Sequence, residues 1–581
     1  MKLLRDLVIN RREFQDWHHN LHWGRDGSLY MTTYPEICIG QPIFRKDVEN
    51  TSKNLFHVKD HALEYSNKFE FDHATANSLL NSQPVSHAKL CQPSPVDSLL
   101  AILTNNLNVL IYRDHQLLVN LDESEKSLER RSYHSLQWSP DGNHIIVGNE
   151  ASELVVFKLE RRNNEELSYS VAQCVPLNEG GNWVTHICWE EDAIAAALDD
   201  NSAYAISVGK DYEVKQIKPS CRFKIVDLKI VGVCVLITAA GHFYHLELAT
   251  QIYRSLKLGP GDEFYIIPLL QEPTCVILIS DRTSCKVKFE GELTVVPDHR
   301  VSPHLERKFK KWSTISNEFA KYEATMLIHG VALSPDGYSV AIAYSMERVS
   351  TRYRIVSELQ FNITFIPLFE SWQISKKAIG LAWYQTYQIY GCTLPVITND
   401  TSESILNKQV DELRMDFKTY LTVFMNDNQL NKLRFFNFIE DKPSIDLFRR
   451  AIFEFAISKK SDLEHPLDKA SVESLANVLG VESPVEAGTL QMHSDFITES
   501  FDFNKNSDPT VILSEQNHIW RRCAVTLLPI LTTKVKVCPI SSQRVIDIKG
   551  DTFNNYGWFT KTLLEALNNE SVYTGTTMQT C

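Results

Sequence analysis

The amino-acid sequence predicts a mainly β chain: a β-propeller of about seven blades followed by a smaller α+β domain. The first observation is a short phrase that occurs twice, as WSPDG at Trp138–Gly142 and as LSPDG at Leu333–Gly337. The second is that worn copies of this phrase recur at intervals near the length of a propeller blade. The third is a change from strand-like to helical spacing near residue 385.

The repeated phrase has the chemistry of a tight turn between two strands. Proline fixes φ at the first corner, aspartate accepts hydrogen bonds from its own backbone, and glycine takes a positive φ. The stretches that follow it, Ile145–Val147 and Val340–Ala343, are apolar runs typical of buried strands. We therefore interpret the phrase as turn chemistry and not as a binding or catalytic site.

Weaker copies of the phrase place the remaining blades. The aspartates of all copies stand at 26, 97, 141, 192 and 336, so the intervals are 71, 44, 51 and 144 residues. A WD40 blade takes about 40–45 residues. The first interval is then a blade plus an insertion near 35–85, and the last is three blades, for which strand-like runs occur between 224 and 289. The prediction is an irregular, WD40-like propeller over residues 1–390.

Two stretches interrupt this pattern. Residues 4–17 have a helix-like spacing. The basic run Arg307–Trp312 precedes the last blade, whose later strands are expected at 363–365 and 372–383. A basic run with aromatic residues could contact nucleic acid, but charge runs usually face water. We interpret it as a solvated loop or helix between blades.

Residues 391–581 form the predicted α+β domain. Its expected elements are helices at 411–439, 445–457, 468–479 and 558–567, strands at 522–530, 534–537 and 545–548, and a polar linker at 499–516.

Composition restricts the function. A net charge of −13 argues against a stand-alone nucleic-acid binder, because phosphate contacts come from Lys and Arg. The sequence shows neither a signal-peptide pattern nor an apolar run of about 20 residues, so we expect no secretion and no membrane span. The 12 cysteines are scattered, which indicates reduced thiols in the cytosol or nucleus.

We predict no catalytic, cofactor-binding or metal residue. The sequence contains no phosphate loop, dinucleotide fingerprint, zinc-protease motif, nucleophile elbow or kinase signature. His18, His19 and His22 could place two imidazoles on one helical face. No Cys, Asp or Glu completes a metal site there, so a polar helix end is the expected role.

Cys523 and Cys538 are the other metal candidates. A zinc knuckle needs Cys-x-x-Cys, but Ser541 occupies the second position after Cys538, and His518 supplies only a third donor. We expect two buried structural thiols, with a residual zinc site as the alternative. A catalytic cysteine is disfavoured because no activating base is identifiable.

Seven stretches carry a family resemblance from end to end of the chain: Met1–Leu4, Ser52–Lys59, Asn77–Val85, Lys308–Ile315, Gly380–Tyr390, Thr526–Thr533 and Tyr556–Thr560. They resemble the small propeller subunits of the yeast RNA polymerase III transcription factor IIIC. The resemblance implies a non-enzymatic, nuclear scaffold of the tau-B module, which engages the B-box promoter of tRNA genes.

The resemblance also implies partners. These are the larger propeller subunit tau-ninety-one, the tau-one-thirty-eight subunit and the TATA-binding protein, through which initiation factor IIIB is recruited. DNA contact would be mainly indirect, through the complex. Animal relatives have a cysteine-rich, zinc-binding C-terminal end, from which this sequence departs at Ser541.

Two other functions compete on the residues alone. An interaction adaptor of another nuclear or cytosolic complex would show the same worn repeats, and the end-to-end resemblance favours factor IIIC over it. A propeller hydrolase would need Asp, His or Arg residues that converge at corresponding blade positions, and we find none.

Overall fold

A computed structural model of the chain divides into two compact units, which are described separately. The first comprises Met1–Ile43, Asn50–Gln373 and Gln388–Tyr390, and the second Phe44–Glu49, Ile374–Tyr387 and Gly391–Cys581. None of the described helices is long and apolar enough to cross a membrane. The structure describes residues 6–10, 13–14, 20–34, 37–43, 55–61, 88–96, 99–105, 108–113, 116–121, 127–161, 167–209, 212–250, 252–259, 262–281, 283–316, 324–348, 360–369, 385, 389, 443–494, 496–504, 507–538, 541–548, 551, 554–566, 571 and 578–580.

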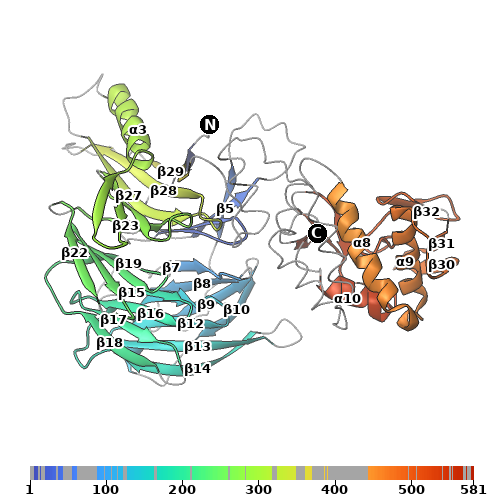
Figure 1. The fold of residues 1–581 in the computed structure, drawn as a ribbon, viewed down its shortest axis with the longest axis horizontal. Coiled ribbons are helices and arrows are strands. Elements are labelled where there is room, and N and C mark those ends of the chain that lie inside the picture. The colour runs from blue at the N-terminus through green and yellow to red at the C-terminus, as the bar shows by residue number, and fades with distance from the viewer. Residues whose placement is uncertain are drawn as a thin grey trace, which may run out of the picture. The chain divides into compact units, whose positions relative to one another are not determined.

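In the described part of the first unit, the strands form seven antiparallel sheets, six of four strands and one of five (Figure 1). The first strand of each sheet contacts the first strand of the next, and β27 contacts β3, so the sheets close into the ring of a β-propeller. The predicted count of about seven blades is confirmed. The strands are, blade by blade, β3 (Leu21–Trp23), β4 (Leu29–Tyr34), β5 (Ile37–Pro42), β6 (Phe56–His61) and the extra β2 (Glu13–Phe14); β7 (Ala88–Pro93), β8 (Leu99–Thr104), β9 (Val109–Arg113) and β10 (Gln116–Leu121); β11 (Tyr133–Trp138), β12 (His144–Asn149), β13 (Glu153–Arg161) and β14 (Leu167–Pro176); β15 (Val184–Glu190), β16 (Ala193–Leu198), β17 (Ala203–Ser207) and β18 (Glu213–Lys218); β19 (Ile225–Val231), β20 (Cys234–Ala239), β21 (His242–Glu247) and β22 (Tyr253–Lys257); β23 (Tyr265–Pro268), β24 (Cys275–Ile279), β25 (Ser284–Lys288) and β26 (Thr294–Pro297); and β27 (Ala324–Leu333), β28 (Ser339–Arg348), β29 (Gln360–Pro367) and β1 (Leu7–Asn10).

The apolar core of the propeller lies between neighbouring blades. One cluster joins Leu99 and Ile111 of the second blade to Trp138, Val147 and Phe157 of the third. Each of these side chains is almost fully removed from water. Similar clusters join the seventh blade to the first, the first to the second, and the third to sixth blades in succession, so the blades depend on one another for their stability.

The first strand of the chain belongs to the last blade. β1 pairs with β29 in antiparallel register, Leu7 opposite Ile363 and Ile9 opposite Phe361. Leu7 and Ile9 are buried while Val8 is 44% exposed, which is the two-residue alternation of a strand. The predicted helix-like segment over 4–17 is therefore wrong at β1 and β2, because pairing with other strands decides the backbone there.

The turns expected between the first two strands of a blade are present. Gly142 and Gly337 have φ of +67° and +73°. In each turn the glycine N–H donates to a serine carbonyl three residues earlier, Ser139 at 3.0 Å and Ser334 at 2.7 Å. A Cβ on Gly142 would lie 2.2 Å from Cγ2 of Val96, in the matching turn of the preceding blade. Glycine thus provides the backbone angle and also lets successive turns pack together.

Two further predictions on the propeller meet described strands or helices, and one does not. β5 and β6 fall within 35–85 and complete the first blade, while 62–87 lie outside the described residues. The predicted strand 372–383 also lies outside them. The run Arg307–Trp312 lies on helix α3 (Val301–Ser316), between the sixth and seventh blades, as the solvated-helix interpretation expected. A short helix, α2 (Leu128–Arg131), precedes the third blade.

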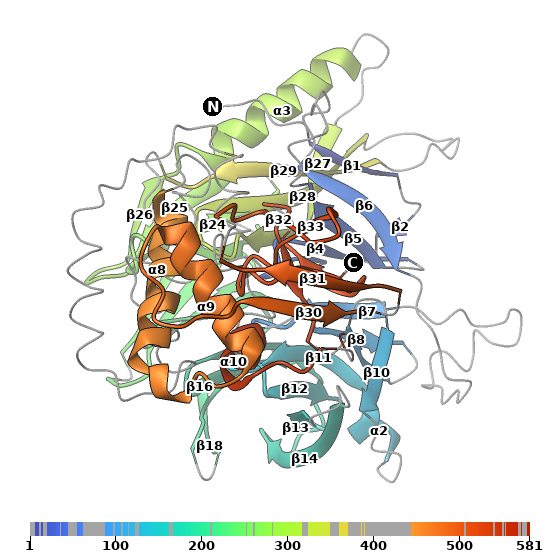
Figure 2. The same ribbon diagram turned by 90° about the vertical axis from the view of Figure 1, so that its right-hand side faces the viewer.

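The second unit is mixed helix and strand, and in Figure 2 its helices are the orange and red coils. The expected helices 445–457, 468–479 and 558–567 are observed nearly in place, and 411–439 lie outside the described residues. The elements are α8 (Pro443–Ser458), the 3-10 helix η2 (Lys460–Asp462), α9 (Pro466–Leu479), β30 (Thr489–His493), β31 (Thr498–Asp502), β32 (Val511–Leu513), β33 (Ile519–Arg521), β34 (Val535–Val537), β35 (Arg544–Ile546), α10 (Trp558–Ala566) and β36 (Gln579–Thr580).

Two predictions for this unit are wrong. Residues 499–516 are not a plain linker, because β31 overlaps them and β32 lies within them. Residues 522–530 are not a strand: they form a turn closed by an isolated bridge between Arg522 and Pro529. The apolar run of this turn is buried because it packs under α9, and not because it is a sheet strand.

The glycine turns give a test of the fold. Gly142→Ala adds a Cβ at positive φ and in contact with Val96, whereas Gly232→Ala adds one at φ +58° with nothing within 4 Å. We expect Gly232→Ala to cost about 1 kcal/mol from φ alone and Gly142→Ala clearly more. Thermal melting of the two variants beside the parent chain measures the difference, and equal melting temperatures for both would contradict the packing role.

Candidate functional site

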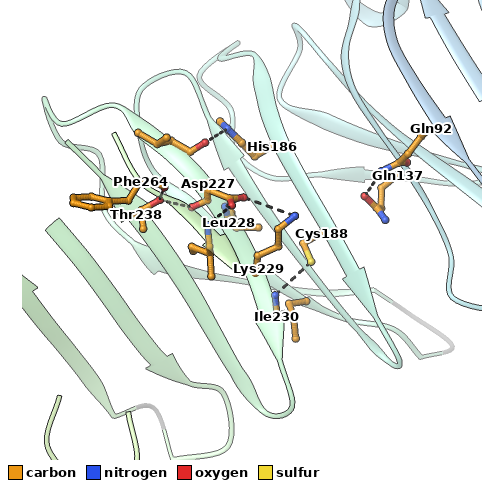
Figure 3. A network of polar contacts seen from close by, with 12 residues as sticks. Gln92, Gln137, His186, Cys188, Asp227, Leu228, Lys229, Ile230, Thr238 and Phe264 are labelled. Carbon is orange, nitrogen blue, oxygen red and sulfur yellow. Dashed lines mark hydrogen bonds and ion pairs between the residues drawn. The ribbon is translucent and has the colours of Figure 1, made fainter. Parts of the chain in front are cut away.

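Polar side chains connect the innermost strands of neighbouring blades, and Figure 3 shows the best-developed group. His186 on β15 places Nε2 3.1 Å from the carbonyl oxygen of Val226 on β19. The Asp227 carboxylate accepts from the N–H of Ile266 on β23 at 2.8 Å. Between the second and third blades, Nε2 of Gln92 on β7 donates to Oε1 of Gln137 on β11 at 2.8 Å. These bonds link one blade to the next.

The electrostatics of this group favour a structural role. Lys229 lies 3.8 Å from Asp227, whose carboxylate raises the pKa of the lysine, so it stays a cation. Burial raises the pKa of the neighbouring Cys188 to about 11, which keeps a neutral thiol at physiological pH. A protonated thiol is a poor nucleophile. Asp227 and His186 already hold backbone groups, so the cluster positions blades and offers no activated nucleophile or base.

Helix α3 contacts the seventh sheet where β1 pairs with β29. Lys308 on α3 forms an ion pair with Asp6, which immediately precedes β1. The Tyr344 hydroxyl of β28 donates to the same carboxylate at 2.7 Å. Nε2 of His304 lies 2.9 Å from Oγ1 of Thr364 on β29. One residue of the basic run, Lys308, therefore makes an ion pair within the propeller, which agrees with a helix between blades.

A groove of about 570 Å³ runs between the outer strands of the fourth and fifth blades. Its walls carry apolar side chains such as Ile206 and Leu246 and a few charged ones, among them Lys215 and Glu247. No three His, Cys, Asp or Glu side chains of the described residues gather anywhere in a way that could hold a metal ion. The groove is formed where the outer strands of these two blades meet.

In the second unit, α9 organises the residues around it. Its buried Asp468 accepts from the N–H groups of Phe559 and Thr560 at 3.1 and 2.9 Å, so it caps the start of α10. Arg522 is buried beside α9, donating to Ser474 at 3.0 Å and to the carbonyl of Leu527 at 2.7 Å. Burial lowers the pKa of Arg522 to about 10, which still leaves it charged at neutral pH.

The two candidate cysteines lie in tight turns of this unit. Cys523 and Cys538 are both fully buried. His518, proposed as a third donor, instead lies 2.6 Å from Oε1 of the buried Glu499 and is 58% exposed. Of the N-terminal histidines, His22 lies on β3 and His18 and His19 fall outside the described residues. Neither group is assembled into a metal site in the part of the chain that the structure describes.

Sequence reasoning missed several of these residues. Asp227, Asp468 and Arg522 were not singled out, because each acts through backbone groups far away in the sequence. Asp468 could have been noticed, since it stands in the first turn of a predicted helix, but its partners lie about 90 positions later. Only the fold shows that it caps another helix.

Residues 489–578 match the family described as "Putative zinc-finger of transcription factor IIIC complex". Together with the ring of seven sheets, this match defines a β-propeller protein with a factor IIIC zinc-finger-family region. Over its full length the chain is 47% identical to the transcription factor tau 60 kDa subunit of Saccharomyces cerevisiae, in an alignment of 588 residues that covers all of both chains. The chain therefore belongs to the family of tau 60 kDa subunits of RNA polymerase III transcription factor IIIC.

Solved structures also show weak similarity. A chain of the mitotic checkpoint complex aligns with a TM-score of 0.40 and 12% identity, covering 62% of this chain and 92% of that one. The β-propeller domain of Cps50 from Myceliophteria thermophila aligns with a TM-score of 0.32 and 13% identity, covering 49% and 97%.

The family description implies zinc, but the residues present do not fit a zinc finger. A structural zinc takes four thiolate or imidazole ligands. In this chain Thr526 and Ser541 stand three positions after Cys523 and Cys538, where a knuckle has its second ligand. The Cys538 sulfur accepts a hydrogen bond from the Ser541 N–H at 3.4 Å. Two thiolates with two neutral hydroxyls are a poor donor set for zinc.

The burial of His304 on α3 gives a prediction for the stability of the propeller at acidic pH. Burial, with Lys308 and Arg307 nearby, lowers the pKa of His304 to about 4, while Asp6 opposes this. Because the unfolded chain takes up the proton near pH 6.5, stability is present above that value and is lost as pH falls toward 4. We expect His304→Gln to lose less melting temperature between pH 7 and pH 5 than the parent chain.

The matched control is His57→Gln, at an exposed position of β6. It should keep the pH dependence of the parent chain. If His304→Gln and the parent chain showed the same dependence of melting temperature on pH, the lowered pKa of His304 would be contradicted.

Proposed function

We propose that this chain is a non-enzymatic scaffold subunit of RNA polymerase III transcription factor IIIC, in its tau-B module on the B-box side. In this role it supports assembly on tRNA genes in the nucleus and recruitment of initiation factor IIIB through the TATA-binding protein. Its direct partners are the larger propeller subunit tau-ninety-one and the tau-one-thirty-eight subunit, and contact with DNA is mainly indirect.

The observation that carries the proposal is the 47% identity to the yeast subunit over the whole of both chains. A scaffold function also suits the chemistry of the propeller. The polar groups of its inner strands hold neighbouring blades together, and the Cys188 thiol is held neutral. The net charge of −13 agrees with DNA contact that falls mainly to partner subunits.

The second unit has apolar side chains suited to a subunit interface. Leu513 and Ile519 lie directly opposite each other on the β32–β33 hairpin and are 50% and 74% exposed. Phe496, in the β30–β31 turn, is 85% exposed. The hairpins are tied together, since Glu499 of β31 contacts His518 beside Ile519. Exposed apolar residues of this size indicate a surface for another protein, and we assign this surface to a partner subunit.

The direct test is purification of the tagged chain from cells with identification of the proteins that accompany it. We expect the other factor IIIC subunits. Recovery of the subunits of a different complex would favour an adaptor function and overturn the proposal.

The interface is tested with Phe496→Ser/Ile519→Ser. We expect the variant to recover several-fold less of the partner subunits, because it removes two exposed apolar contacts without touching the core. Val233→Ser is the matched control, since Val233 is 59% exposed in a propeller turn. Equal recovery with both variants would place the interface elsewhere.

A further inference from the structure

Two turns in the zinc-finger-family region make the same backbone hydrogen bonds in spite of different sequences. The first turn is residues 523–527 and the second is residues 538–542. The residue that ends each turn has a left-handed backbone, with φ of +57° at Leu527 and +58° at Ser542. Its N–H donates to the carbonyl of the leading cysteine, Cys523 or Cys538, at 2.9 Å in both cases.

The match extends beyond the ends of the turns. The N–H of Cys523 donates to the carbonyl of Leu528 at 2.8 Å, and that of Cys538 to the carbonyl of Gln543 at 2.9 Å. Each cysteine therefore has the same two backbone bonds at the same spacing. Left-handed φ is unfavourable for leucine and serine, because their Cβ comes too close to the following carbonyl oxygen. Two non-glycine residues in this state, both four positions after a cysteine, mark a backbone shape that the fold imposes.

Turns with these backbone hydrogen bonds are compatible with a zinc knuckle, in which two ligands three positions apart face one ion. Zinc ribbons use two such turns, each with a Cys-x-x-Cys pair. Here the leading positions keep cysteine, and the following ones carry Thr526 and Ser541. The turns are also adjacent, because the Ala524 N–H donates to the carbonyl of Arg544, next to Gln543, at 2.8 Å.

Contacts within the protein hold the turns where a metal would otherwise do so. Oγ of Ser471, on α9, donates to the carbonyl of Thr526 at 2.7 Å. The buried Arg522 guanidinium connects Ser474 of α9 to the carbonyl of Leu527. The first turn is thus anchored to a helix by three hydrogen bonds. The second is closed by the Ser541 N–H on the Cys538 sulfur and is followed by β35, which pairs with β34.

We propose that residues 489–578 form a zinc ribbon that has lost its metal: Thr526 and Ser541 replace two of four thiolates, and α9 with Arg522 takes over the structural work of zinc. The inference concerns the family region alone and does not depend on the function proposed above. It predicts that the full chain folds and stays folded without zinc, and that two substitutions restore a site.

The test begins with the parent chain under reducing conditions. Elemental analysis of the purified full-length protein should give far less than one zinc per chain, and a strong chelator should leave its melting temperature unchanged. One zinc per chain together with a clear loss of melting temperature on chelation would overturn the proposal.

The second arm is Thr526→Cys/Ser541→Cys, which completes two Cys-x-x-Cys pairs. We expect about one zinc per chain, a raised melting temperature with zinc, and with cobalt(II) the visible absorption of a tetrahedral thiolate site. Adding Cys523→Ser to this variant should weaken binding by at least tenfold. A folded double variant that binds neither metal would show that the turns do not converge, and the proposal would fail.

Should the double variant not fold, Thr526→Val/Ser541→Ala keeps the test decisive. It removes both hydroxyls that could serve as weak ligands. Melting behaviour and zinc content like those of the parent chain would support metal independence. A loss of bound zinc on this change would contradict it.

Discussion

The propeller depends on one strand pairing, that of β1 with β29. Without β1 the seventh sheet would keep only β29, β28 and β27, and no strand would tie the N-terminal segment to the last blade. By placing Leu7 and Ile9 in the seventh sheet, the chain joins the first and last strands of the propeller in one hydrogen-bonded ladder. The blades share their apolar cores, so opening this ladder would expose surface between the first and seventh blades. Helix α3 strengthens the same place through Lys308, which forms an ion pair with Asp6, and Tyr344 of β28 donates to the same carboxylate.

The polar groups of the inner strands follow from the same geometry. Close packing around a ring brings backbone donors of one blade near side chains of the next, and a buried donor without a partner is costly. Asp227 accepts from the Ile266 N–H, which is such a donor, whereas Nε2 of His186 pairs with a buried acceptor, the carbonyl oxygen of Val226. Residue types that elsewhere perform catalysis are here used to satisfy the backbone. This explains why a chain with many such residues on its inner strands still suits a scaffold role.

The sequence predicts secondary structure correctly where a single turn or a single helix determines it. The glycine turns at Gly142 and Gly337, the blade count and helices α8, α9 and α10 were predicted, because proline, glycine and helical spacing act over a few residues. Contacts between residues far apart in the chain could not be predicted from the sequence. The N-terminal strand looked helical until its partner β29 was known, and the turn after Arg522 looked like a strand because its apolar residues pack under α9. In the candidate zinc region the sequence points to Ser541 but not to Thr526, since only the matching backbone hydrogen bonds relate the two turns.

That match has a consequence for how a metal site can be lost. A structural zinc supplies its binding free energy to folding, so removing a ligand pair would normally unfold a small domain. The loss is tolerated when other contacts already fix the turns, and in this region Ser471 and Arg522 hold the first turn from α9. Asp468 fixes the start of α10 from the same helix. Helix α9 therefore bonds both to the first turn and to α10. The left-handed residues Leu527 and Ser542 are the part of the turn geometry that a zinc ribbon would keep after losing its metal.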